Sequence, residues 1–195
     1  MRTASIQRKT NETDISLAVN LDGRGESLVD TGCGFLNHML TLFSKHSLID
    51  LNVNCKGDTD VDFHHTVEDI GIALGCAIKS ALGDMRGINR YGYMILPMDE
   101  ALILTSVDIS GRASLSCELD IPSQKVGDFD TELCEEFMAA FTRSLACSLH
   151  IKQLNGKNSH HIIEGTFKSL ARSLRQAVSI DPVTANDIPS TKGVI

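Results

Sequence analysis

The chain repeats itself, and this duplication constrains its fold more than any other feature of the sequence. The segment Glu12–Arg24 resembles Glu100–Arg112, and both segments end in Gly-Arg. A second motif, two adjacent histidines followed three residues later by glutamate (HHxxE), also occurs twice, beginning at His64 and at His160. We therefore predict two similar halves, residues 1–90 and 91–195, each with one HHxxE motif.

Each half begins with alternating apolar and polar residues and then changes to helical spacing. The predicted strands are Ala4–Thr10, Asp14–Leu21, Leu48–Lys56, Tyr93–Leu96, Leu102–Ile109 and Ala113–Asp120. The predicted helices are Phe35–Ser44 and Thr131–Ser148, and each HHxxE motif opens a further helix. The stretch Asp120–Phe129 is typical of a loop and accounts for the extra length of the second half. The pattern predicts an α+β fold in which each half has a mixed sheet of about four strands packed against two helices.

The HHxxE motif has the spacing of a metal-chelating helix turn. Each residue of a helix turns by about 100°, so the first histidine and the glutamate share a face. His64 can therefore chelate an ion with Glu68, while His65 points elsewhere and must address another ion or partner. The same holds for the second motif. Imidazole and carboxylate without thiolate suit Mn, Fe, Co or Zn, and two copies favour two metal centres over one.

A further ligand in each half is plausible. His38 opens the helix before the first motif, and Glu136 occupies the corresponding place in the second half. His46 and His150 could instead be structural histidines. A single HHxxE motif could also be a helix start with surface histidines, but two copies at equivalent places in a repeat favour a metal site.

Charge and composition exclude several classes of protein. The net charge of −7 argues against a nucleic-acid binder, which usually has a basic stripe, but it leaves room for a small phosphorylated substrate. No apolar run approaches the roughly 20 residues that span a bilayer. The six cysteines form no CxxC pair, which is typical of buried thiols in a reducing compartment. We expect a cytoplasmic protein, or a plastid protein if the chain is a trimmed plant one.

The motifs together resemble the imidazoleglycerol-phosphate dehydratase family over essentially the full length. The matching stretches are Arg8–Thr13, Thr31–Leu40, His64–Asp69, Met98–Leu102, Gly156–Glu164, Phe167–Lys168 and Pro189–Gly193. Their order and spacing are specific, although no one of them would be. The resemblance implies the ribosomal protein S5 domain 2-like fold and the stand-alone form of the enzyme.

The resemblance also implies a reaction, a cofactor and an assembly. Family members are lyases of histidine biosynthesis that remove water from D-erythro-imidazole-glycerol phosphate to give imidazole-acetol phosphate. They use two Mn(II) ions per active site, which act as Lewis acids on the imidazole. They form homo-oligomers, here expected to be 24 subunits built from trimers, with active sites at subunit contacts.

The resemblance assigns roles to particular residues. The implied metal ligands are His38, His64, His65, Glu68, Glu136, His160, His161 and Glu164, where Glu136 stands in the place of a histidine in many relatives. The implied substrate contacts are Glu12, His46, Arg90, Arg112, Lys168, Ser190 and Lys192. The residues expected to be catalytic are Glu12, His65 and Glu164, with Glu12 and Glu164 as alternative carriers of the proton. The C-terminal tail, which contains Ser190 and Lys192, is expected to bind the phosphate.

One residue departs from the family pattern. Asn37 precedes His38 where an aspartate is usual, and we expect its oxygen to accept a hydrogen bond and orient His38 without the negative charge. Two other readings remain open. A dinuclear metallohydrolase would favour Asp-rich bridging ligands, and a metal-stabilised assembly without catalysis would make the Pro189–Lys192 segment dispensable.

Overall fold

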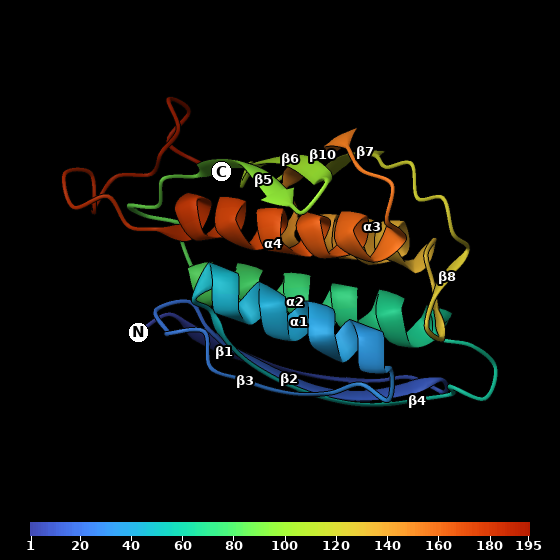
Figure 1. Ribbon diagram of the computed structural model, residues 1–195. Coiled ribbons are helices and arrows are strands. Elements are labelled where there is room, and N and C mark those ends of the chain that lie inside the picture. The colour runs from blue at the N-terminus through green and yellow to red at the C-terminus, as the bar shows by residue number, and fades with distance from the viewer.

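Two four-stranded sheets form the outer layers of the molecule, and four helices lie between them (Figure 1). The computed structural model describes residues 1–195. The first half contains β1 (Thr3–Lys9), β2 (Thr13–Asn20), β3 (Ser27–Asp30), α1 (Gly34–Ser47), β4 (Asp50–Gly57) and α2 (His64–Leu82). The second contains β5 (Tyr91–Met98), β6 (Ala101–Asp108), β7 (Ser114–Glu118), β8 (Lys125–Val126), β9 (Phe129–Asp130), α3 (Leu133–Leu145), β10 (Ser148–Asn155) and α4 (Ser159–Val178).

The two sheets have the same topology. The strand order is β1-β2-β4-β3 in one sheet and β5-β6-β10-β7 in the other. In each sheet the last pair, β3 with β4 and β7 with β10, is parallel, while the remaining pairs are antiparallel. The predicted α+β fold with two similar halves is confirmed.

The helices of one half pack against those of the other. Helix α1 lies against α4, and α2 lies against α3. One continuous apolar cluster joins both halves, from Ile15 and Phe43 in the first to Phe137 and Leu170 in the second. The halves therefore share a core, and side chains at the helix interfaces come from both copies of the repeat.

Three details of the predicted elements were wrong. Strands β3 and β10 were not predicted: β3 is only four residues long, and the predicted helix Thr131–Ser148 overlaps β10 at its first residue only. Helix α3 ends at Leu145, not Ser148, because Ala146 adopts a left-handed conformation with φ of 59°. The predicted loop Asp120–Phe129 contains the hairpin β8–β9, whose two-residue turn begins with Gly127 at φ of 60°.

That hairpin brings an aromatic side chain towards the first half. Phe129 is fully buried, and its ring centroid lies 5.1 Å from that of Phe35 on α1. Phe35 in turn meets the ring of His160 edge-on at 5.2 Å. The β8–β9 hairpin thus packs, through Phe35, against the HHxxE motif of the second half. No helix combines the length and the apolar character needed to cross a membrane.

Close contact between α2 and α3 depends on glycine. A Cβ atom at Gly75 would lie 2.7 Å from the carbonyl oxygen of Phe141 and 2.9 Å from the backbone nitrogen of Leu145. Backbone atoms cannot move aside cheaply, so any side chain here would push the two helices apart.

We therefore expect Gly75→Ala to lower the free energy of unfolding by about 1–3 kcal/mol through overpacking. Gly34→Ala is the matched control, because nothing lies within 4 Å of a Cβ at the start of α1. Urea unfolding at one fixed protein concentration measures both variants. Equal midpoints for the two variants would show that the α2–α3 contact is not close-packed.

Candidate active site

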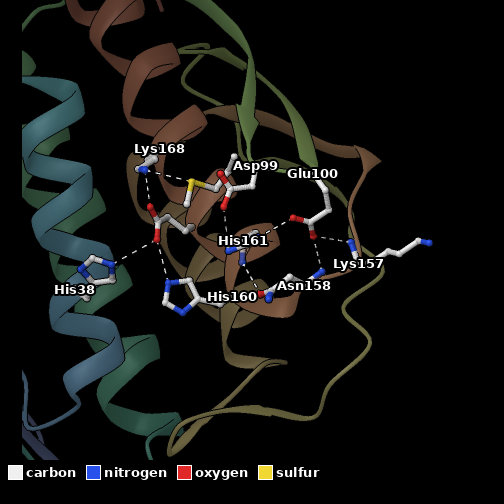
Figure 2. Close-up of polar contacts among 10 residues, drawn as sticks. His38, Asp99, Glu100, Lys157, Asn158, His160, His161 and Lys168 are labelled. Carbon is white, nitrogen blue, oxygen red and sulfur yellow. Dashed lines mark hydrogen bonds and ion pairs between the residues drawn. The ribbon is translucent and has the colours of Figure 1, made fainter.

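The second HHxxE motif gathers three metal-binding groups at the α1–α4 interface. Helix α4 begins at Ser159, where the side chain of Asn158 accepts the backbone N–H of His161. One helical turn separates His160 from Glu164, and His160 Nε2 lies 3.0 Å from Glu164 Oε2. His38 Nε2 on α1 lies 3.5 Å from the same oxygen (Figure 2). The ligand atoms of these three residues, the His38 cluster, lie within 4.8 Å of one another.

The carboxylate of this cluster is held in its ionised form. Glu164 is only 6% exposed, and burial alone would raise the pKa of its carboxyl group. Hydrogen bonds from Lys168 and His160 outweigh that effect and hold the pKa below its usual value. Burial and the nearby charges of Lys168 and Arg172 lower the pKa of His46, so the imidazole of His46 is neutral at pH 7. His46 and Lys168, two of the predicted substrate contacts, thus belong to the surroundings of the His38 cluster.

The second histidine of this motif points to different partners. Figure 2 shows His161 turned away from His38 and towards Glu100 and Asp99. Its Nδ1 lies 2.7 Å from Glu100 Oε2, and its Nε2 lies 3.5 Å from Asp99 Oδ2. In this half His160 and Glu164 therefore lie together, as helix geometry predicts, and His161 faces other partners.

Glu100 is locked by several donors at once. Besides His161, the backbone N–H groups of Lys157 and Asn158 donate to its other oxygen. These bonds, that from His161 first, lower the pKa of Glu100 to about 2. The same contact raises the pKa of His161. Because an ionised carboxylate only accepts, the Nδ1 of His161 carries a proton and its Nε2 is left as the ligand atom.

The first HHxxE motif holds its second histidine with another residue. His65 Nδ1 lies 2.9 Å from Asp58 Oδ2, and this contact raises the pKa of His65. Glu12, the repeat equivalent of Glu100, lies on the opposite side, with Oε1 3.7 Å from His65 Nε2. The side chain of Glu12 accepts no hydrogen bond and is 52% exposed. Asp58 therefore contacts Nδ1 of the second histidine in this motif, as Glu100 does in the other, and the Glu12 carboxylate is left without a hydrogen bond.

In the first motif Glu68 is paired with a residue other than His64. Glu68 Oε1 instead accepts a hydrogen bond of 3.0 Å from Arg143 on α3. Glu136, on the same helix α3, is partly buried and makes no side-chain hydrogen bond or ion pair. A guanidinium forms a charge-assisted hydrogen bond with a carboxylate, and the packing of α3 against α2 brings Arg143 within reach of Glu68.

A cationic pocket lies near the C-terminal tail. Its volume is about 220 Å³, and its polar lining is Arg90, Ser110, Arg112, Ser190, Thr191 and Lys192. Four of the predicted substrate contacts are thus brought together here, while Lys168 lies at the His38 cluster instead.

Arg90 mainly anchors the tail beside this pocket. Its Nε and Nη2 donate to the two carboxylate oxygens of Asp108, and its Nη1 donates to the carbonyl of Pro189 at 3.0 Å. Arg112 makes only a local side-chain bond to the carbonyl of Ser110, and Lys192 makes none. The charges of Arg112 and Lys192 are therefore available to an anion.

Asn37 does not orient His38, so that expectation was wrong. Its Oδ1 accepts hydrogen bonds from the backbone N–H and the hydroxyl group of Thr31, at 2.9 and 2.6 Å. Asn37 thus fixes the loop before α1, a task that needs an acceptor oxygen and no charge.

The sequence analysis missed Asp58, Asp69 and Glu100 as parts of the site. Glu100 had a signal, because it is the repeat equivalent of Glu12 and lies in the matched stretch Met98–Leu102. Asp69 follows Glu68 directly and ends the matched stretch His64–Asp69. Asp58 had no signal, because the strand register of the two sheets makes Lys157 its counterpart in the repeat.

Fold and site together define an α+β protein built from two repeats, each with histidine and carboxylate groups at the start of a helix. A family profile described as "Imidazoleglycerol-phosphate dehydratase" matches residues 31–174. The curated imidazoleglycerol-phosphate dehydratase of Rhodopseudomonas palustris (strain BisB5) is 57% identical over 193 residues, which cover 99% of this chain and 98% of the relative. That of Synechococcus sp. (strain WH7803) is 53% identical over 195 residues, covering 100% of this chain and 96% of the relative.

Solved structures agree. The crystal structure of imidazoleglycerol-phosphate dehydratase from Staphylococcus aureus superposes with a TM-score of 0.84 at 41% identity, covering 92% of this chain and 99% of that one. The enzyme from Pyrococcus furiosus, in complex with (S)-C348, gives a TM-score of 0.82 at 36% identity and covers 97% of this chain and 100% of that one. The chain belongs to the imidazoleglycerol-phosphate dehydratase family. It is therefore an enzyme of histidine biosynthesis, in the class of hydro-lyases.

Proposed function

We propose that this chain removes water from D-erythro-imidazole-glycerol phosphate, giving imidazole-acetol phosphate, and that it needs Mn(II), two ions per active site. The observation that carries the metal dependence is the His38 cluster, whose three ligand atoms lie within 4.8 Å of one another. Two imidazoles and one carboxylate without thiolate suit a divalent first-row metal such as Mn(II). The side chains present thus fit the ion.

The ligands divide into two sets. His38, His160 and Glu164 would hold one ion. His64, Glu68 and Glu136 would hold the other, once Arg143 releases Glu68. His65 and His161, whose Nδ1 atoms face Asp58 and Glu100, present Nε2 to an ion held elsewhere. When bound, the ions supply Lewis acidity at the nitrogens of the substrate's imidazole ring.

We assign the proton transfer to Glu12 and not to Glu164. Glu164 accepts hydrogen bonds from Lys168 and His160, so its oxygens are engaged. Glu12 is half exposed, has no hydrogen-bond partner and lies next to His65. A carboxylate that is free to accept and return a proton is what general acid–base catalysis requires.

The cationic pocket is the proposed seat of the substrate's phosphate. Arg112, Lys192 and the hydroxyl group of Ser190 supply charge and donors there, while Arg90 holds the tail in place. Lys168 and His46 would meet the substrate from the side of the His38 cluster.

We also propose a homo-oligomer with shared active sites, expected to be 24 subunits built from trimers in the cytoplasm or a plastid. No residue of the His38 cluster lines the cationic pocket. Within one chain the proposed metal ligands and the proposed phosphate site are therefore separate, which favours a site completed by another subunit. The large apolar side chains Tyr91, Tyr93 and Ile95 are exposed along the edge strand β5, where another copy could cover them.

The dehydration itself is tested with purified protein and imidazole-glycerol phosphate, while the metal content of the same sample is measured. Exhaustive chelation should abolish activity, and Mn(II) should restore it, because the imidazole substrate needs a Lewis acid. Activity that survives removal of all metal would disprove the metal dependence. Absence of dehydration in the Mn(II)-loaded protein would disprove the reaction.

Removal of one pocket charge should weaken substrate binding. We expect Lys192→Ala to raise the KM for the phosphorylated substrate by about tenfold or more, because a charge-assisted hydrogen bond is worth about 1.5–3 kcal/mol. Steady-state kinetics measure this, and the unfolding midpoint should not change. Lys79→Ala is the control, since Lys79 is exposed at the end of α2. An unchanged KM in Lys192→Ala would place the phosphate elsewhere.

Sedimentation and light scattering test the assembly. The expected particle has many times the 21.2 kDa mass of one chain. A charged residue in place of Tyr93 should reduce that mass if β5 lies at a subunit contact. A fully active monomer would contradict the shared site.

A further inference from the structure

Glu12 lies in the short turn between β1 and β2, and this turn is held by its own side chains. The hydroxyl group of Thr10 accepts the backbone N–H groups of Glu12 and Thr13, at 3.1 and 2.9 Å. The N–H of Thr10 donates to the carbonyl of Thr13 at 2.9 Å. On the other side, the carbonyl of Glu12 accepts the N–H of Asp58 at 3.0 Å. The backbone of Glu12 is therefore fixed although its side chain is free.

A buried carboxylate ties this turn to helix α2. The Thr13 hydroxyl donates to Asp69 Oδ2, and Arg8 Nη2 donates to Asp69 Oδ1 at 2.7 Å. Asp69 is only 6% exposed and Thr13 only 3%. Asp69 lies one helical turn after His65, so both side chains face the turn that carries Glu12.

The second half lacks this arrangement. Thr13 corresponds to Ala101 in the repeat, and Asp69 corresponds to Gly165 of the second HHxxE helix. A Cβ at Gly165 would lie 2.9 Å from a side-chain carbon of Ile103, so this place is apolar. There Glu100 is held directly by His161 and two backbone N–H groups. The buried network thus occurs only in the half whose glutamate has no hydrogen bonds of its own.

We infer that Asp69, acting through the Thr13 hydroxyl and supported by Arg8, is the positioning residue that holds the Glu12 carboxylate beside His65. The inference rests on the proposed role of Glu12 in proton transfer. A carboxylate with no partner of its own can reach a defined place only if its backbone is fixed, because a displacement of about 1 Å can cost on the order of a hundredfold in rate. Asp69 and Thr13 are both buried, so they act through the backbone of Glu12.

The test compares Thr13→Val, which removes the hydroxyl at nearly constant volume, with Thr13→Ser, which keeps it. In the Mn(II)-loaded enzyme, Thr13→Val should lower kcat by about ten- to a hundredfold and change KM by less than about twofold. Thr13→Ser should stay within about threefold of wild type. The Mn content of both variants should match wild type, and the unfolding midpoint should fall only in Thr13→Val, because the buried Asp69 carboxylate loses a donor there. If Thr13→Val does not assemble, Thr10→Val loosens the same turn and carries the same expectation.

A double-mutant cycle with Glu12→Gln separates positioning from general stability. Once Glu12 is gone, Thr13→Val should lower kcat by less than about twofold further, because it acts through Glu12. Wild-type kcat in Thr13→Val, or an undiminished loss in the Glu12→Gln background, would overturn the inference. Wild-type kcat in Glu12→Gln alone would overturn the proposed role of Glu12, and with it the inference.

Discussion

The packing of α1 against α4, and of α2 against α3, is the contact on which the site depends. His38 comes from the first half, while His160 and Glu164 come from the second. The three ligand atoms meet only because the two helix layers dock face to face. The same contact buries the core that both halves share, so the site and the stability of the fold have one origin.

The sequence predicted most of the architecture, because the repeated segments and the two HHxxE motifs are still recognisable in both halves. The α+β class, the equivalent halves and the helix at each HHxxE motif all followed from period and spacing. The i, i+4 pairing of His160 with Glu164 followed from helix geometry alone. The family resemblance, not the pattern, brought Ser190 and Lys192 into consideration, and the structure places both at one pocket.

What the sequence could not predict depends on contacts between segments far apart in the chain. Arg143 takes Glu68 away from His64 because α3 lies against α2, which no local pattern reveals. Asp58 replaces the repeat equivalent of Glu100 as the partner of His65, although its own counterpart is a lysine. Asn37 fixes the loop before α1, because its side-chain oxygen accepts two hydrogen bonds from Thr31 across that loop. Each case is a choice among several polar partners, and the tertiary fold makes that choice.

Two of the three candidate ligand carboxylates, those of Glu164 and Glu68, already carry a positive partner from the chain itself. Lys168 lies 2.5 Å from Glu164, and Arg143 lies 3.0 Å from Glu68. In the metal-free chain neither glutamate is therefore an uncompensated charge next to the apolar core, which would be costly. Lys168 contacts Oε1 of Glu164, while His38 and His160 face Oε2, so the lysine neutralises the carboxylate and leaves the oxygen of the His38 cluster to an ion. The duplicated fold thus provides a subunit in which one ligand carboxylate of each HHxxE motif is electrostatically balanced by a cation of the chain itself.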